Sequence, residues 1–187
     1  MLLLDTFVAW SDRVRADRVA QILRPHIHGR TLDVGCWNGE VASRLGDAVV
    51  GLDVVQPPKP RIPVTLFDGR TIPYPDRAFD TVLCCTALHH ADDQDALLAE
   101  MLRVGRRIVI LEDSFDSTAE RISVTLLHAI GSRLVSLPYR RDGFRTSSEW
   151  CNLFERHGLR VAHCERHPGV QPGWLFLRHP LFVLESP

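Results

Sequence analysis

Short apolar runs alternate with longer amphipathic stretches along this chain. Between Asp5 and His28, apolar residues recur at helical spacing with arginine and aspartate between them, which predicts an N-terminal helix. The runs that follow are short, β-branched and almost entirely apolar, as is typical of strands buried on both faces of a sheet. We expect strands at about residues 30–36, 48–54, 64–67, 79–86 and 106–112, and helices at 40–45 and 95–104. This alternation predicts a mainly parallel sheet with helices on both of its faces.

The C-terminal part of the chain has a different pattern. Residues 117–138 form a strongly apolar helical segment, and Thr146 and Glu149 are spaced as a capping box at the start of a helix that runs to His157. Two closing strands, at 159–165 and 181–185, have no helix between them, so we expect an antiparallel hairpin at the sheet edge. The predicted fold is therefore α/β and Rossmann-like: a doubly wound, mainly parallel seven-stranded sheet with an antiparallel C-terminal hairpin.

Acidic residues follow several of the predicted strands. Asp53 ends the second strand, Asp68 follows the third, and Glu112 and Asp113 follow the fifth. Right-handed crossovers place all of these strand ends at one edge of the sheet, and α/β sheets bind their ligands outside that edge. We therefore expect these acids to face one crevice.

The first strand leads into a glycine-containing turn at Thr31–Glu40. A strand, a tight turn and a helix bring backbone N–H groups and a positive dipole end to one point, which suits a nucleotide-like or carboxylate-bearing ligand. The glycines are spaced Gly35-x-x-x-Gly39, unlike the G-x-G-x-x-G of dinucleotide-binding proteins.

Composition limits the classes of function. The chain has 187 residues, 45% hydrophobic and 24% charged, which suits one globular domain. A formal net charge of -1 gives no overall field that would attract nucleic acid or an anionic membrane. No apolar run resembles a signal peptide or a membrane span. The 5 cysteines form no CxxC pair, so we interpret them as reduced thiols of a cytoplasmic protein; Cys36 has no neighbouring base that would make it a nucleophile.

Taken in order, these motifs resemble a class I S-adenosylmethionine-dependent methyltransferase of the methyltransferase type 11, or UbiE-like, family. Trp37 stands where the family has the middle glycine of GxGxG, and the usual PGG turn is reduced to Gly105–Arg107. The prolines of 56–63 forbid the helix usually found between the second and third strands. The match covers about residues 30–165 and comprises Leu32–Gly39 as motif I, Gly51–Asp53, Phe67–Gly69, Ile72–Asp80, Leu88–His90, Leu98–Val104 and Glu149–Val161.

The resemblance implies S-adenosylmethionine as the cofactor. By analogy with the family, Asp33 anchors the ammonium group and Asp68 accepts from the adenine amine. Asp53 lies about 20 residues past the start of the motif, the spacing at which an acid binds ribose hydroxyls. Trp37 either lies beside the methionine end of the cofactor or is a core or surface aromatic. The implied cofactor-binding residues are Asp33, Gly35, Cys36, Trp37, Gly39, Asp53, Val54, Asp68, Gly69, Thr86 and Ala87.

Methyl transfer from a sulfonium is an in-line displacement with a good leaving group, so positioning supplies most of the catalysis. His90, and less so His89, are candidates to accept a proton from the nucleophile; the alternative for each is a helix cap or a core imidazole. The apolar segment is expected to cover the acceptor. His128, Tyr139, Arg140 and Arg145 are tentative acceptor contacts, the arginines alternatively forming a solvated basic turn, and no metal ligand is assigned.

We expect one methyltransferase domain over residues 1–187: an N-terminal helix (1–29), a cofactor-binding core (30–113), an acceptor cover (114–146), and a last helix with the closing hairpin (147–187). The predicted function is methyl transfer to a small-molecule acceptor, with no nucleic-acid partner, no stable membrane insertion and room for a homodimer. A nicotinamide-dependent oxidoreductase is one alternative, disfavoured by the glycine spacing and by Lys59 being the only lysine. The other alternative is a non-catalytic member that binds the cofactor or a partner protein. Trp37 and the lack of a predicted helix in the crossover at residues 56–63 favour it.

Overall fold

The computed structural model describes residues 2–57, 59–135, 142–168 and 178–185. Within these residues a seven-stranded sheet has the order β3-β2-β1-β4-β5-β7-β6. Only β7 runs against the other strands, because it pairs antiparallel with both β5 and β6. The strands are β1 (Thr31–Val34), β2 (Val49–Asp53), β3 (Val64–Leu66), β4 (Phe79–Cys85), β5 (Gly105–Leu111), β6 (Arg160–Pro168) and β7 (Arg178–Glu185). The predicted fold class is confirmed.

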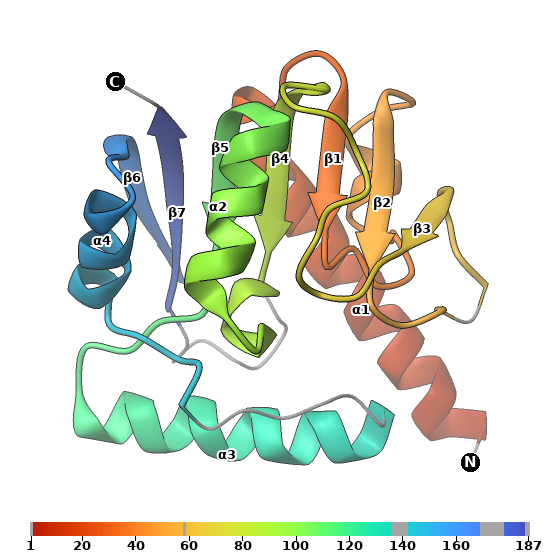
Figure 1. Cartoon of the computed structure of the whole chain (residues 1–187). Coiled ribbons are helices and arrows are strands. Elements are labelled where there is room, and N and C mark those ends of the chain that lie inside the picture. The colour runs from red at the N-terminus through yellow and green to blue at the C-terminus, as the bar shows by residue number, and fades with distance from the viewer. Residues whose placement is uncertain (1, 58, 136–141, 169–177, 186–187) are drawn as a thin grey trace.

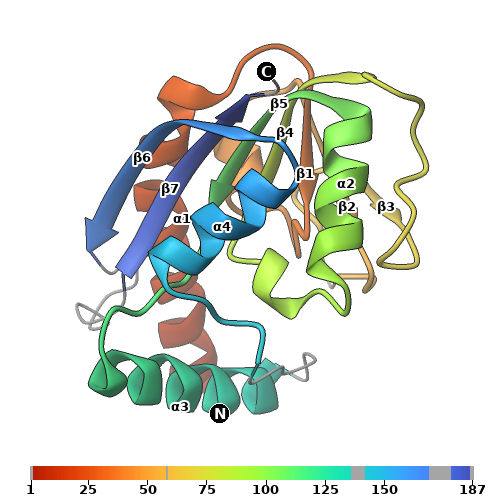
Figure 2. The same ribbon diagram turned by 60° about the vertical axis from the view of Figure 1, so that its left-hand side comes forward.

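Helices cover both faces of the sheet and one of its edges (Figures 1 and 2). Helix α1 (Leu2–Leu23) packs behind the sheet, and α2 (Gln94–Val104) and α4 (Ser147–Arg156) pack in front of it. Helix α3 (Thr118–Val135) lies across the carboxyl ends of the parallel strands. The carboxyl edge of the sheet is therefore bordered by α3 and by the N-terminal half of α1.

The central strands are buried on both faces because their side chains alternate between two cores. Val82 and Cys84 of β4 pack with α2 and α4, including Met101 and Trp150. Leu83, between them, packs on the opposite face with residues of α1. This arrangement explains why β4 and β5 are nearly continuous apolar runs in the sequence.

Capping residues fix the N-terminal ends of α2 and α4, the two helices in front of the sheet. The predicted capping box is present: Thr146 Oγ1 accepts from the Glu149 N–H at 3.2 Å, and Glu149 Oε2 accepts from the Thr146 N–H at 2.7 Å. Asp93 caps α2 by accepting from the Ala96 N–H at 2.9 Å. Such caps each contribute about 1 kcal/mol.

The prediction of a helix over residues 40–45 is wrong. Only a 3-10 turn, η2 (Ala42–Arg44), forms there. A segment bounded by Gly39 and Gly46 is too short to repay helix nucleation, and Arg44 instead pairs with Glu40. The glycine turn therefore has backbone N–H groups near it but no helix dipole of useful length. The expected lack of a helix in the crossover is confirmed for the described residues between β2 and β3.

Candidate functional site

The glycine turn after β1 is fixed by close backbone packing. Gly35 has φ of 75°, and a Cβ there would clash with the Cβ of Ala87 at the exit of β4. Gly39 has φ of 72°, and a Cβ there would clash with Ile62 of the crossover. Both positions therefore require glycine, because the backbone is left-handed and there is no room for a Cβ. Gly35 thereby allows the exits of β1 and β4 to lie close together.

Trp37 stands at the position of the family's middle glycine and has a left-handed backbone conformation. Its φ is 48°, a left-handed value that costs a non-glycine residue about 1 kcal/mol. The Trp37 N–H donates to Asp53 Oδ2 at 2.7 Å, and the Val55 N–H donates to Oδ1 at 3.0 Å. These bonds fix the Asp53 carboxylate at the end of β2 and leave each oxygen a further lone pair.

Asp33 is a buried carboxyl group with an unsatisfied oxygen. The residue is 2% exposed, and its Oδ1 has no hydrogen-bond partner among the described residues. Burial, and secondarily the charge of Asp53, raise the pKa of Asp33 to about 7, while Arg15 opposes this rise. A buried oxygen of this kind is costly unless a ligand or water satisfies it.

Val54 and Gly69 lie against each other where β2 and β3 end. Val54 is 51% exposed there, and a Cβ on Gly69 would lie 3.3 Å from Val54 Cγ1. Asp68 is exposed and accepts from the Arg70 and Thr71 N–H groups at 2.8 and 2.7 Å. These backbone bonds lower the pKa of Asp68, so the carboxylate remains an acceptor at neutral pH.

The exit of β4 contacts α1 through a residue that the sequence reasoning missed. Arg15 donates to Thr86 Oγ1 at 2.6 Å, and its charge acts on Asp33. Thr86 has φ of 49°. In the sequence Arg15 is one of several arginines in the predicted N-terminal helix, so nothing marks it as the residue that contacts the exit of β4.

Glu112 organises the turn η3 (Leu88–His90) from beneath. Its Oε1 accepts from the Ala87 and Leu88 N–H groups at 3.0 and 2.6 Å, and its Oε2 lies 2.6 Å from His89 Nδ1. Burial alone would lower the pKa of His89, but the charge and hydrogen bond of Glu112 outweigh it and raise the pKa. Glu112 is fully buried beneath η3, and its role in holding His89 was not predicted.

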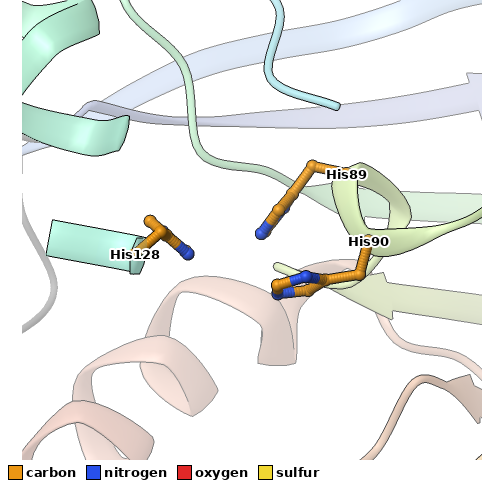
Figure 3. Close-up of side chains that lie close together, drawn as sticks. All are labelled: His89, His90 and His128. Carbon is orange, nitrogen blue, oxygen red and sulfur yellow. The ribbon is translucent and has the colours of Figure 1, made fainter. Parts of the chain in front are cut away.

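Three histidines meet beside this turn (Figure 3). The ring centroid of His89 lies 4.1 Å from that of His90 and 5.0 Å from that of His128 on α3. The Phe144 ring stacks on His89 at 4.6 Å. The structure therefore brings together both candidate proton acceptors and one tentative acceptor contact.

Asp113 links α3 to β7. It accepts from His128 Nε2 at 2.9 Å and from His179 Nε2 at 2.7 Å. Burial opposes its ionisation, but the charge of His179 and the bond from His128 hold the pKa of Asp113 well below its usual range. His179 was missed by the sequence reasoning because it stands inside a strand with no motif around it.

The other predicted site residues are distributed differently. Tyr139 and Arg140 lie outside the described residues. Arg145 donates to Gln94 Oε1 at 2.8 Å and lies over the Trp150 ring, contacts that give it a structural role between α2 and α4. Cys36 is buried, and burial followed by the charges of Asp33 and Asp53 raises the pKa of its thiol, which disfavours a nucleophilic role.

This strand order is that of a Rossmann-like fold, with acids and glycines at or just after the carboxyl ends of β1, β2 and β3, and the fold is shared with a solved S-adenosylmethionine-dependent methyltransferase. Residues 32–110 match the protein family described as a methyltransferase domain. The predicted family resemblance is therefore confirmed, and S-adenosylmethionine is the cofactor of this class, as predicted.

The chain is similar to 27-O-demethylrifamycin SV methyltransferase of Amycolatopsis mediterranei, with 31% identity over 114 residues, 50% of this chain and 42% of that protein. It is similar to the ubiquinone/menaquinone biosynthesis C-methyltransferase UbiE of Geobacter sulfurreducens, with 33% identity over 108 residues, 46% of this chain and 42% of that protein. The match thus spans less than half of each relative. A solved S-adenosylmethionine-dependent methyltransferase from Thermotoga maritima shares the fold, with a TM-score of 0.68, 16% identity, and coverage of 96% of this chain and 95% of that one.

Proposed function

We propose that this chain transfers a methyl group from S-adenosylmethionine to a small-molecule acceptor. The observation that carries the proposal is the buried Asp33 carboxyl group, whose Oδ1 lacks a partner among the described residues at the carboxyl end of β1. The ammonium group of a bound methionine moiety would satisfy that oxygen and offset the cost of its charge.

The remaining cofactor contacts follow from the geometry of the strand exits. Asp53 is held with lone pairs to spare, and one carboxylate can accept from both hydroxyls of a ribose. The adenine ring would lie on the exposed side chain of Val54, with Asp68 near it to accept from the exocyclic amine. Gly35, Cys36, Trp37 and Gly39 border the methionine end, and Thr86 and Ala87 close the site from β4.

The reaction would be an in-line displacement at the sulfonium methyl. A neutral thioether leaves, so the protein contributes chiefly by holding donor and acceptor in line. His90 is partly exposed at the exit of β4, whereas His89 is fully buried and bonded to Glu112. We therefore place His90 ahead of His89 as the group that accepts a proton from an acidic acceptor.

The acceptor would lie under α3. Val124 and Leu127 on the inner face of that helix pack with Phe115 and Phe144, which gives the cover an apolar lining. The relatives are named for a rifamycin and for ubiquinone and menaquinone biosynthesis, which supports a small-molecule acceptor. Among the described residues, no helix is both long and apolar enough to cross a membrane. A cytoplasmic location, supported by five free thiols, and a homodimer remain predictions.

Calorimetric titration of the whole chain tests the proposal. We expect saturable 1:1 binding of S-adenosylmethionine, no heat with NADH, and a loss of affinity of at least about 10-fold in Asp53→Ala, since a charged hydrogen bond is worth about 1.5–3 kcal/mol. Asp47→Ala, which removes an exposed acid remote from the crevice, is the matched control. Equal affinity in wild type and Asp53→Ala would refute the placement of the cofactor.

A second candidate is a non-catalytic binder of the cofactor. The strained Trp37 at the glycine position favours it, because the ring could crowd the methyl end of the ligand. The two candidates differ in one readout: the binder would saturate with S-adenosylmethionine yet release no S-adenosylhomocysteine with any member of a broad acceptor panel.

A further inference from the structure

The histidines at the exit of β4 converge on one point. One ring nitrogen from each of His89, His90 and His128 lies within 4.8 Å of the other two. In Figure 3 the three rings extend from η3 and α3 into the same space. His89 Nε2 is buried and has no hydrogen-bond partner among the described residues.

One carboxylate orients the His89 ring as ligand histidines are commonly oriented, and a second carboxylate lies beside the cluster. Glu112 Oε2 lies 2.6 Å from His89 Nδ1, which fixes the ring and directs Nε2 toward the other two histidines. Asp113 Oδ2 lies 2.9 Å from His128 Nε2 and 4.0 Å from His89 Nε2, beside the same point. Its other oxygen is held by His179 Nε2 at 2.7 Å. Ligand histidines are commonly oriented by carboxylates through their second nitrogen, and ligating carboxylates are themselves hydrogen-bonded.

We propose that His89, His90 and His128 bind one divalent transition-metal ion, with Asp113 as the fourth ligand. Zinc holds nitrogen ligands at about 2.0–2.1 Å, so tetrahedral ligand atoms stand roughly 3.4 Å apart. Closing from 4.8 Å needs small side-chain rotations of the partly exposed His90 and His128. Imidazole nitrogens with one carboxylate suit Zn²⁺, Mn²⁺, Fe²⁺ or Co²⁺, whereas Mg²⁺ and Ca²⁺ favour all-oxygen sites.

This site goes beyond the proposed methyl transfer, and in a metal-loaded chain His90 would be a ligand of the ion and not the group that accepts a proton from the acceptor. The metal would lie between η3 and α3, where the three labelled histidines meet (Figure 3). A bound ion there could act as a Lewis acid on an acceptor oxygen, or it could simply fasten α3 over the site. Metal binding is measured without either substrate, so its failure and the failure of the proposed function are separate results.

Titration of the metal-free chain with Co²⁺ and Zn²⁺ tests the proposal. We expect one Co²⁺ per chain, with the visible ligand-field absorption of a four-coordinate ion, displaced by Zn²⁺ and unaffected by excess Mg²⁺. His128→Gln should weaken Zn²⁺ binding by at least about 100-fold, measured by competition with a chromophoric chelator.

Two further variants keep the test decisive. His90→Gln should reproduce the loss, and its partly exposed position limits the effect on folding, which circular dichroism would check. His157→Gln removes a histidine that pairs with Asp95 outside the cluster and should bind as wild type does. A wild-type chain with no saturable 1:1 site, or unchanged affinity in folded His128→Gln and His90→Gln, would overturn the proposal.

Discussion

The unfolding free energy of Asp33→Asn, taken relative to that of the wild type, should increase as the pH rises. The pKa of Asp33 is raised to about 7 in the folded chain, against 3.8 as the ordinary value. Its carboxyl therefore stabilises the fold below pH 3.8, and that contribution is lost as the pH rises through 7. At about 1.4 kcal/mol for each pKa unit, ionisation of this group costs about 4 kcal/mol in total and about 3 kcal/mol between pH 5 and pH 8. Asparagine cannot ionise and avoids this cost.

Urea unfolding of both proteins at pH 5, 6, 7 and 8 measures the effect. The difference in unfolding free energy, variant minus wild type, should grow by about 3 kcal/mol over this range, because constant offsets from the amide cancel. Saturating S-adenosylhomocysteine, which carries the same ammonium group as the donor, should flatten the pH dependence of the wild type.

The matched control is Asp68→Asn, because Asp68 is exposed and its pKa is lowered by backbone N–H groups. Its stability relative to wild type should not rise with pH between 5 and 8. If the difference in unfolding free energy between Asp33→Asn and wild type stayed constant from pH 5 to pH 8, Asp33 would not be a buried group that ionises at a cost in the folded chain.

Two further changes probe the glycine turn. Trp37→Gly should relieve about 1 kcal/mol of left-handed backbone strain and should keep the backbone N–H bond to Asp53. Calorimetry should therefore show a cofactor affinity at least equal to that of the wild type. A tenfold loss of affinity would show that the indole ring itself binds the cofactor. Gly35→Ala should lower the unfolding free energy by at least about 2 kcal/mol, because the new Cβ clashes with Ala87. Adding Ala87→Gly to the same chain should restore part of the lost unfolding free energy. If it restored none, the positive φ of residue 35 would account for the whole loss.

Much of the fold could be predicted because it follows from local patterns. Apolar β-branched runs located the strands, and the prolines of the crossover excluded a helix. The capping box at Thr146 marked the start of α4 to the residue. The helix expected at 40–45 failed because periodicity does not report the cost of nucleation in so short a segment.

The site was less accessible to sequence reasoning. Asp33 and Asp53 follow from their positions at strand ends, which one motif and one spacing indicate. Arg15 contacts Thr86, and His179 contacts Asp113, only because α1 and β7 pack where they do. The pairing of His128 with His89 depends on the direction in which α3 crosses the sheet edge, and no local pattern encodes that direction.

The central claim is that the carboxyl edge of β1 and β2 binds S-adenosylmethionine. Calorimetric titration of wild type, Asp53→Ala and Asp47→Ala at one pH tests it most directly. The account predicts saturable 1:1 binding in wild type and Asp47→Ala, and binding at least about 10-fold weaker in a folded Asp53→Ala. Absence of saturable binding in wild type, or equal binding in all three proteins, would contradict it.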